Sequence, residues 1–305
     1  MLRRRRRWIA TVAWVALASC CSAALAQVPE GVLTGTLQKV RKSGEVAIGY
    51  REASIPFSYL SARGEPIGYS IDICRAIVDA MSTEVGRDLA IKWVPVTSDN
   101  RIKAVISGQV DLECGSTTSN LERKKVVDFS PVIFVAGTKL LVKKGSPIKS
   151  FRDLAGRSVV VTTGTTNESA LRELVAKFKL NTTIATGRDH ADSYAQLVEG
   201  KVDAFATDDV LLYGFIALNR AQDQLTVVGE FLSYDPYGIM FRKDDPQLAS
   251  IVLKTLHDLA ASRELEQTYS KWFLRQLPTG SRLNLPMSAQ MTEIIRIMGG
   301  DAATQ

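Results

Sequence analysis

The pattern of apolar and polar positions divides the chain into short apolar runs and helix-spaced apolar sets. A short apolar run is typical of a buried strand, and apolar positions three or four residues apart mark one face of a helix. Each predicted helix start carries a capping residue: Ser70 after the first strand, and Ser98 or Asp99 after the second. This alternation favours parallel β-α-β units. In the first half, the runs predict strands at 46–50, 91–96 and 110–114.

The same alternation resumes in the second half of the chain. Helices are expected to begin at Thr165, Asp189 and Asp208–Asp209. A further helix runs through Leu253 and Leu256, and a last one lies around Met291–Met298. Strands are predicted at 132–135, 138–142, 159–161, 202–206 and 237–241.

We therefore predict an α/β fold with two Rossmann-like lobes, in which the chain crosses into the second lobe and later returns. A length of 305 residues agrees with two domains of about 150 residues each. The expected bounds are 36–135 plus 233–280 for lobe 1, 136–232 for lobe 2, and 281–305 for a C-terminal helix and tail.

The N-terminus has the pattern of a secretory signal peptide. Five arginines, Arg3 to Arg7, precede an apolar run over 8–18, and Ala24-Leu25-Ala26 forms a small-residue cleavage site. The run is too short for a membrane-spanning helix, which needs about 20 apolar residues. Leu17-Ala18-Ser19-Cys20 also resembles a lipobox, in which the cysteine is lipidated. We expect a signal peptide at 1–26 and a periplasmic protein, with anchoring at Cys20 as the alternative.

Charge at first points to a different class of protein. With 38 Lys and Arg against 32 Asp and Glu, the net charge of +6 is typical of proteins that bind nucleic acid or anionic membranes. Removal of the five signal-peptide arginines leaves 33 basic and 32 acidic residues. The mature chain is therefore nearly neutral, and we expect no nucleic-acid partner and a monomer.

The remaining chemistry is sparse. The sequence contains no G-x-G-x-x-G, Walker A, H-E-x-x-H or G-x-S-x-G motif, and only two histidines. We expect no enzyme activity, no metal and no cofactor. Processing leaves Cys74 and Cys114, for which we expect buried free thiols, although a disulfide stays open because the sequence does not give their separation.

Hydroxyl residues gather at two expected helix N-termini, in Gly115–Ser119 and in Gly164–Thr166. Such ends bind anions through free N–H groups and the helix dipole. The alternative is plain capping, since Ser119-x-x-Glu122 and Thr165-x-x-Glu168 both fit a capping box.

Several charged residues fall at the carboxyl ends of predicted strands or at helix starts, where ligands of parallel sheets bind. For the arginines the alternative is a solvated surface, especially for Arg123 beside Lys124 and Lys125. Asp208 suits a ligand ammonium or an N-cap, and His190 a cap or a surface position. The residues that together indicate an anionic ligand are Arg51, Arg101, Ser116 and Arg123.

The order and spacing of these motifs resemble the bacterial periplasmic solute-binding proteins of family 3, and among them the glutamate/aspartate-binding proteins of ABC importers. The resemblance runs from about Leu37 to about Pro278. Its motifs are Gly49–Tyr59, Gly68–Asp72, Thr97–Arg101, Glu113–Thr118, Glu122-Arg123, Asp128–Ser130, Gly164–Thr166, Asp189-His190 and Thr207–Asp209.

The resemblance implies a type II periplasmic binding protein fold, with two lobes joined by two hinge strands. It also implies an L-glutamate or L-aspartate ligand and ABC permease subunits as partners. Arg123, Thr118 and Thr166 would hold the α-carboxylate, and Asp208 and Ser116 the α-ammonium. The side-chain carboxylate would be held by Arg51, Ser98, Arg101 and His190.

Two alternatives to transport stay open. Some relatives of this fold are dehydratases of the cyclohexadienyl type, for which Asp208 is the one candidate acid, and others are sensory modules. The chain also departs from the family's cysteine pattern, which places a cysteine near Ile239 and none at Cys74.

Overall fold

The computed structural model describes residues 31–300, and the chain from Leu33 onward forms one compact unit. The predicted signal peptide and Cys20 lie outside the described residues. Within the described range no helix has the length and apolar character needed to cross a bilayer.

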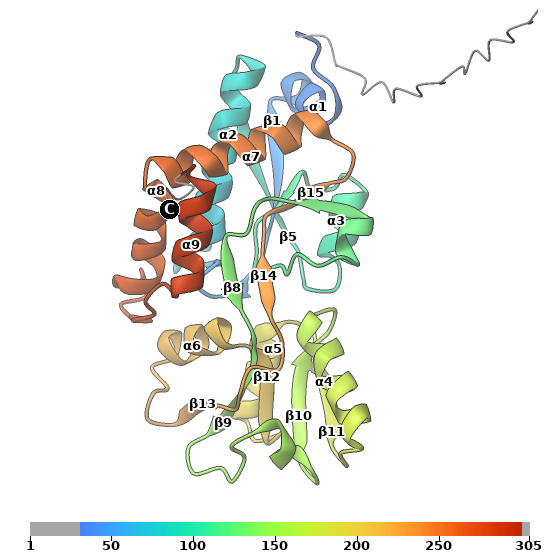
Figure 1. The fold of residues 1–305 in the computed structure, drawn as a ribbon, viewed down its shortest axis with the longest axis vertical. Helices are drawn as coiled ribbons and strands as arrows, with labels where there is room; N and C mark the ends of the chain where they lie inside the picture. Colours follow the sequence, from blue (N-terminus) through green and yellow to red (C-terminus); the bar gives the residue numbers. More distant parts are fainter. Residues whose placement is uncertain (1–30, 301–305) are drawn as a thin grey trace, which may run out of the picture. The chain divides into compact units, whose positions relative to one another are not determined.

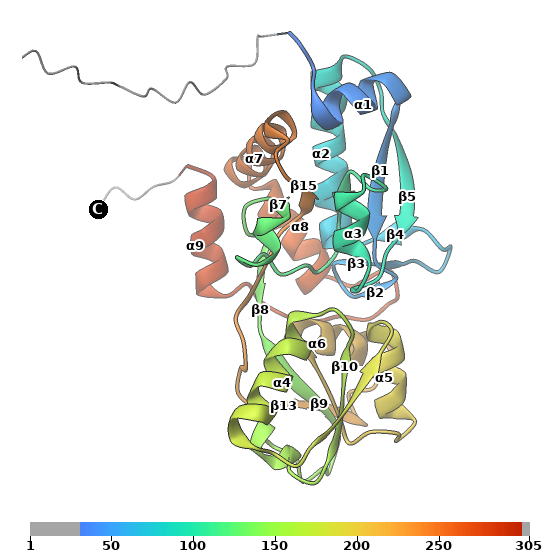
Figure 2. The same cartoon turned by 90° about the vertical axis from the view of Figure 1, so that its right-hand side faces the viewer.

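The first lobe is built on a five-stranded sheet in the order β5-β1-β6-β15-β7 (Figures 1 and 2). Strand β1 runs parallel to β5 and β6, whereas β15 is antiparallel to β6 and β7. Its strands are β1 (Glu45–Tyr50), β5 (Ala90–Pro95), β6 (Leu112–Glu113), β7 (Val127–Phe129) and β15 (Met240–Arg242). Its helices are α1 (Gly35–Ser43), α2 (Tyr69–Val85), α3 (Arg101–Ile106), α7 (Pro246–Ala261), α8 (Glu264–Tyr269), a π-helical turn (Ser270–Leu274) and α9 (Ala289–Met298).

The second lobe repeats this build with a sheet in the order β11-β10-β12-β9-β13. Strand β10 is parallel to β11 and β12, and β9 is antiparallel to β12 and β13. Its strands are β9 (Thr138–Lys143), β10 (Ser158–Thr162), β11 (Thr183–Gly187), β12 (Ala204–Asp208) and β13 (Leu225–Val228). Its helices are a 3-10 turn (Phe151–Leu154), α4 (Thr166–Phe178), α5 (His190–Val198) and α6 (Asp209–Leu218).

Two strands pass between the lobes, as predicted. Strand β8 (Phe134–Ala136) pairs antiparallel with β14 (Asp235–Tyr237), and Figure 1 shows the chain leaving the first lobe along β8 and returning along β14. The α/β fold, the parallel units and the hinge strands are therefore confirmed. The residue bounds of the two lobes stay a prediction.

A small sheet after β1 is absent from our sequence prediction. It consists of β2 (Ala53–Ser54), β3 (Ser58–Leu60) and β4 (Pro66–Ile67). The Ser58 hydroxyl accepts the Arg51 backbone N–H at 2.8 Å and donates to the Arg51 carbonyl at 3.1 Å. The sheet thus fixes the backbone of a predicted ligand residue.

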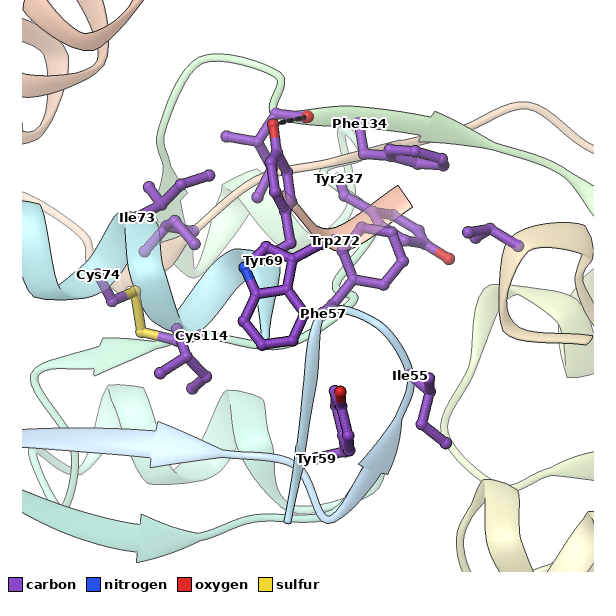
Figure 3. Packing of buried hydrophobic residues seen from close by; sticks show 14 of the residues in the cluster. Ile55, Phe57, Tyr59, Tyr69, Ile73, Cys74, Cys114, Phe134, Tyr237 and Trp272 are labelled. Atoms are coloured by element: carbon purple, nitrogen blue, oxygen red, sulfur yellow. Dashed lines mark hydrogen bonds between the residues drawn. A yellow bond between two sulfur atoms is a disulfide. The ribbon is translucent and has the colours of Figure 1, made fainter. Parts of the chain in front are cut away.

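An aromatic cluster joins this small sheet to the hinge. The Phe57 ring lies edge-on to Phe134 of β8 at 5.0 Å and to Tyr237 of β14 at 5.1 Å between centroids (Figure 3). Offset and edge-on ring pairs add about 0.5–1.5 kcal/mol beyond area burial. The hinge strands are therefore anchored to the first lobe by ring packing.

The two tryptophans of the described chain are both fixed in the first lobe. The Trp272 indole Nε1 donates to Asp72 Oδ2 at 2.6 Å, and its ring packs edge-on against Tyr59. Trp93 on β5 packs edge-on against Tyr50, with the Arg75 guanidinium 5.1 Å from its ring centroid.

The expectation of free thiols is wrong. Cys74 on α2 and Cys114, directly after β6, form a disulfide with their Cα atoms 6.3 Å apart, inside the bridging range (Figure 3). Helix α2 places Cys74 against the end of β6, a proximity that sequence spacing does not reveal.

The predicted helix caps have mixed outcomes. Thr165 caps α4 and accepts the Glu168 N–H, as predicted. Helix α2 begins after Gly68, and the Ser70 hydroxyl donates to the Gly115 carbonyl instead. Ser119 starts no α-helix, since only a 3-10 turn (Arg123–Lys125) follows, so that capping box is wrong.

Candidate functional site

Arg51 is the residue that directly follows β1, and only 1% of it is exposed. Its Nη2 donates to Ser98 Oγ at 2.7 Å, and its Nη1 has no hydrogen-bond partner among the described residues. Burial, and next the charge of Arg101, lowers the pKa of Arg51 to about 9. A buried cation with an unsatisfied N–H is costly, and an anionic ligand would relieve that cost.

Arg101 is the first residue of α3 and is 2% exposed. Its Nε is buried without a partner in the described chain, and burial lowers its pKa. The positive charge of Arg101 in turn lowers the pKa of Arg51 and of Arg123.

Arg123 lies in the 3-10 turn and contacts both lobes. Its Nη1 donates to the Thr118 carbonyl at 2.8 Å, and its Nη2 donates to the Gly164 carbonyl at 3.4 Å. Burial, and next the charge of Arg101, lowers its pKa to about 9. Lys124 and Lys125 are exposed, so the solvated-surface alternative holds for them and is wrong for Arg123.

Glu113 is a site residue that our sequence analysis missed. It is fully buried on β6, where Oε2 accepts from Thr117 Oγ1 at 2.7 Å and Oε1 has no partner within the described range. Its negative charge raises the pKa of all three arginines. A glutamate inside the apolar strand 110–114 is the sequence signal that could have revealed it.

The hydroxyl residues meet where the lobes meet. Thr166 is the first residue of α4, and its Oγ1 lies 3.2 Å from Thr118 Oγ1. Both hydroxyl oxygens lie within hydrogen-bonding distance of Asp235 Oδ1. Ser116 is buried and its hydroxyl has no partner in the described part of the chain. Asp235, from the hinge strand β14, was also missed.

Asp208 closes β12 with its carboxylate buried. It accepts from Asn167 Nδ2 at 2.7 Å and from the Tyr237 hydroxyl. Burial, and next the charge of Asp235, raises the pKa of Asp208 to about 8. Asp208 stands at the N-cap position of α6, as the alternative had it, but its side chain makes no capping hydrogen bond.

His190, the first residue of α5, is 2% exposed. Its Nδ1 lies 2.9 Å from Thr162 Oγ1, and burial together with the charges of Arg51 and Arg101 lowers its pKa well below the usual value. Asp189 provides the cap of α5 instead, so His190 has neither the capping nor the surface position.

Apart from Ser116, the predicted residues are linked to one another by hydrogen bonds or by charge. Hydrogen bonds link Arg51 to Ser98, and Arg123 and Thr118 to the second lobe, while the charges of the arginines reach His190 and Asp208. Asn167 and Tyr237, which hold Asp208, were not predicted, because they lie 41 and 29 residues from it in sequence. Residues 31–300 contain no cluster of acidic, histidine and cysteine side chains that could hold a metal.

The sequence is similar to those of two known binding proteins. The L-glutamate/L-aspartate-binding protein of Pseudomonas aeruginosa is 44% identical over 276 residues, covering 90% of this chain and 91% of the relative. The glutamate/aspartate import solute-binding protein of Escherichia coli K12 is 41% identical over 284 residues, covering 92% of this chain and 94% of the relative.

Solved structures agree with the fold. An ancestral arginine-binding protein bound to glutamine superposes with a TM-score of 0.69 at 29% identity, covering 76% of this chain and 99% of that one. An ancestral amino-acid-binding protein, a precursor of cyclohexadienyl dehydratase, gives 0.68 at 32% identity, covering 78% and 99%. The model of the bacterial extracellular solute-binding proteins, family 3, matches residues 46–275. The chain therefore belongs to the bacterial extracellular solute-binding proteins of family 3.

Proposed function

We propose that this protein binds L-glutamate or L-aspartate between its lobes and delivers it to the permease subunits of an ABC importer. The observation that carries the proposal is the set of three buried arginines, of which Arg51 and Arg101 each keep an N–H group without a partner among the described residues. The printed names of the Pseudomonas aeruginosa and Escherichia coli relatives support the ligand class.

Each ligand group has a set of matching side chains. In the proposal, Arg123 pairs with the α-carboxylate, with help from Thr118 and Thr166, because guanidinium binds carboxylate bidentately. Asp208 and Ser116 receive the α-ammonium. The side-chain carboxylate goes to Arg51, Ser98, Arg101 and His190.

The acidic side chain is what selects the ligand. A neutral amino acid would leave Arg51 and Arg101 buried without an anionic partner, which costs several kcal/mol per ion. The carboxylate of Glu113 acts on all three arginines and Asp235 on Arg123, so the acidic residues around the site offset part of its positive charge. In the proposal the second carboxylate of the ligand offsets the remainder.

The site of action is proposed from the N-terminal sequence. Signal-peptide cleavage after Ala26 would release a monomer into the periplasm, and lipidation of Cys20 would anchor it. Mass spectrometry of the exported protein's N-terminus distinguishes the two, and size-exclusion chromatography tests the monomer.

Calorimetry tests the proposal. The mature chain is unfolded, dialysed and refolded without ligand, then titrated with glutamate, aspartate, glutamine and arginine. We expect a micromolar or lower dissociation constant for glutamate, aspartate or both. Glutamine and arginine should bind more weakly. Absence of such binding for both glutamate and aspartate would overturn the proposal.

A second candidate function has one supporting observation. A carboxyl group with a pKa of about 8 is protonated at neutral pH, so Asp208 could donate a proton to a leaving group, as a dehydratase requires. The similarity in fold to the ancestral precursor of cyclohexadienyl dehydratase also supports this candidate. Incubation with prephenate or arogenate tests it, and lack of product would eliminate this candidate.

A further inference from the structure

Asp235 makes contacts that the proposed ligand site leaves unexplained. It is 1% exposed and begins the hinge strand β14. Its Oδ1 accepts from Thr118 Oγ1 at 3.1 Å and from Thr166 Oγ1 at 2.8 Å, and its Oδ2 accepts from Ser233. One hinge carboxylate therefore holds a hydroxyl from each lobe.

The number of hydrogens on these hydroxyls sets a limit. A threonine hydroxyl has one hydrogen to donate. When Thr118 and Thr166 donate to Asp235, they cannot donate the same hydrogens to a ligand carboxylate. Arg123 has no such limit, because its bonds to the Thr118 and Gly164 carbonyls use two of its five N–H groups.

Charge leads to the same conflict. The position that the two threonines and Arg123 offer to a ligand α-carboxylate lies beside the carboxylate of Asp235, and two neighbouring carboxylates repel each other. The bonds to Asp235 also connect the lobes through protein groups alone, since Thr118 belongs to the first lobe and Thr166 to the second.

We infer that Asp235 is a built-in competitor of the ligand α-carboxylate, which holds Thr118 and Thr166 together in the ligand-free protein and must be displaced from both hydroxyls. This inference rests on the proposed function for the identity of the ligand group. A closed state in which Thr118 and Thr166 already donate to Asp235 binds no ligand. The apparent affinity is then the intrinsic affinity multiplied by the fraction of molecules outside that state.

Substitution of Asp235 tests the competition. In Asp235→Ala, we expect glutamate or aspartate to bind roughly tenfold more tightly than in the wild type, a change of about 1.4 kcal/mol. Asp235→Asn removes the negative charge but keeps an oxygen that can accept from both hydroxyls, so its gain should be smaller. The matched control is Ser233→Ala, which removes the hydrogen bond to Oδ2 and those of the Ser233 hydroxyl with Thr138 N and Oγ1 but leaves Oδ1 and its threonine partners in place. It should leave affinity within about twofold. Unchanged or weaker binding in both Asp235 variants, with wild-type circular dichroism, would overturn the inference.

A second measurement does not depend on the ligand's identity. Small-angle scattering of refolded ligand-free protein should give a larger radius of gyration for Asp235→Ala than for the wild type and for Ser233→Ala. An equal radius of gyration in Asp235→Ala and the wild type would refute the proposed role of Asp235 in holding the lobes together. If the wild type binds neither acidic amino acid, the proposed function fails, and the scattering comparison still decides the role of Asp235.

Discussion

At the scale of single residues, Arg101 provides the sharpest test of ligand choice. Its guanidinium is buried with Nε unpartnered in the described chain. In Arg101→Met we expect glutamate binding to weaken by roughly 10- to 100-fold, from the loss of a charged hydrogen bond. Glutamine should lose far less, because its side-chain amide needs no cationic partner. Calorimetric titration with both amino acids measures the difference.

The control for this substitution lies on the same helix. Lys103 is exposed on α3, so Lys103→Met removes an equal charge without touching the buried site. We expect both affinities to stay at wild-type values. Equal losses for glutamate and glutamine in Arg101→Met would contradict the side-chain assignment.

Asp208 predicts how the stability of the ligand-free protein depends on pH. Its pKa is about 8 in the folded state, against an ordinary value of 3.8, so between these values the folded state holds one more proton than the unfolded state. The free energy of unfolding should therefore fall as pH rises through this window, by up to about 1.4 kcal/mol per pH unit from this group. Urea unfolding at several pH values measures the slope.

Asp208→Asn is the comparison for this pH effect, because the amide does not titrate. Its unfolding free energy should lose that component of the slope between pH 4 and 8. A variant with the same pH dependence as the wild type would show that Asp208 is ionised throughout this range.

At the scale of elements, the disulfide joins α2 to the segment that carries Ser116 and Thr118. Its cysteines are 40 residues apart in sequence, and loss of such a cross-link costs about 2–4 kcal/mol. We expect the double substitution Cys74→Ala and Cys114→Ala to lower the free energy of unfolding by this amount in urea titrations. Treatment of the wild type with a reductant should give a similar loss, and an unchanged midpoint in both experiments would contradict a stabilising cross-link.

The pattern of apolar residues predicts a strand well where the strand is buried on both faces. The apolar runs at 46–50 and 159–161 lie within β1 and β10, because both faces of a central parallel strand are covered. Of the strand predicted at 110–114, only Leu112–Glu113 form a strand, β6. The run at 237–241 is instead divided between β14 and β15, since the chain leaves the hinge there to enter the first sheet.

Long-range contacts explain what the pattern did not predict. The charged residues at strand ends were predicted because parallel strands align their carboxyl ends at one edge. Asp235 was missed, since it meets Thr118 across 117 residues of sequence. The pairing of the cysteines depends likewise on how α2 packs, which no local period encodes.

At the scale of the whole molecule, Gly164 limits how closely the lobes can meet. A β-carbon on Gly164 would lie 2.8 Å from Asp99 Cα and 2.9 Å from the Ser98 carbonyl oxygen of the first lobe. Gly164→Ala should therefore oppose closure and weaken glutamate binding by roughly tenfold or more, because backbone atoms cannot move aside as a flexible side chain can. Scattering with and without ligand measures closure.

Gly156 supplies the matched control. It has a φ of +72°, close to the +75° of Gly164, and among residues 31–300 no atom beyond its chain neighbours lies within 4 Å of its would-be β-carbon. Gly156→Ala should then cost only the backbone strain of about 1 kcal/mol in stability and leave affinity unchanged. Similar glutamate affinities in Gly156→Ala and Gly164→Ala would mean that closure does not bring the backbone of Gly164 against that of Ser98 and Asp99.

The placement of the indoles has a practical consequence for spectroscopy. Of the four tryptophans, two precede Ala26, and Trp93 and Trp272 are both fixed in the first lobe, so lobe 2 (136–232) contains none. In a chain cleaved after Ala26, as proposed above, native emission will therefore report on one lobe, even when the other moves. A single fluorophore introduced on the outer face of α4 would turn these indoles into energy-transfer donors and make closure visible in real time.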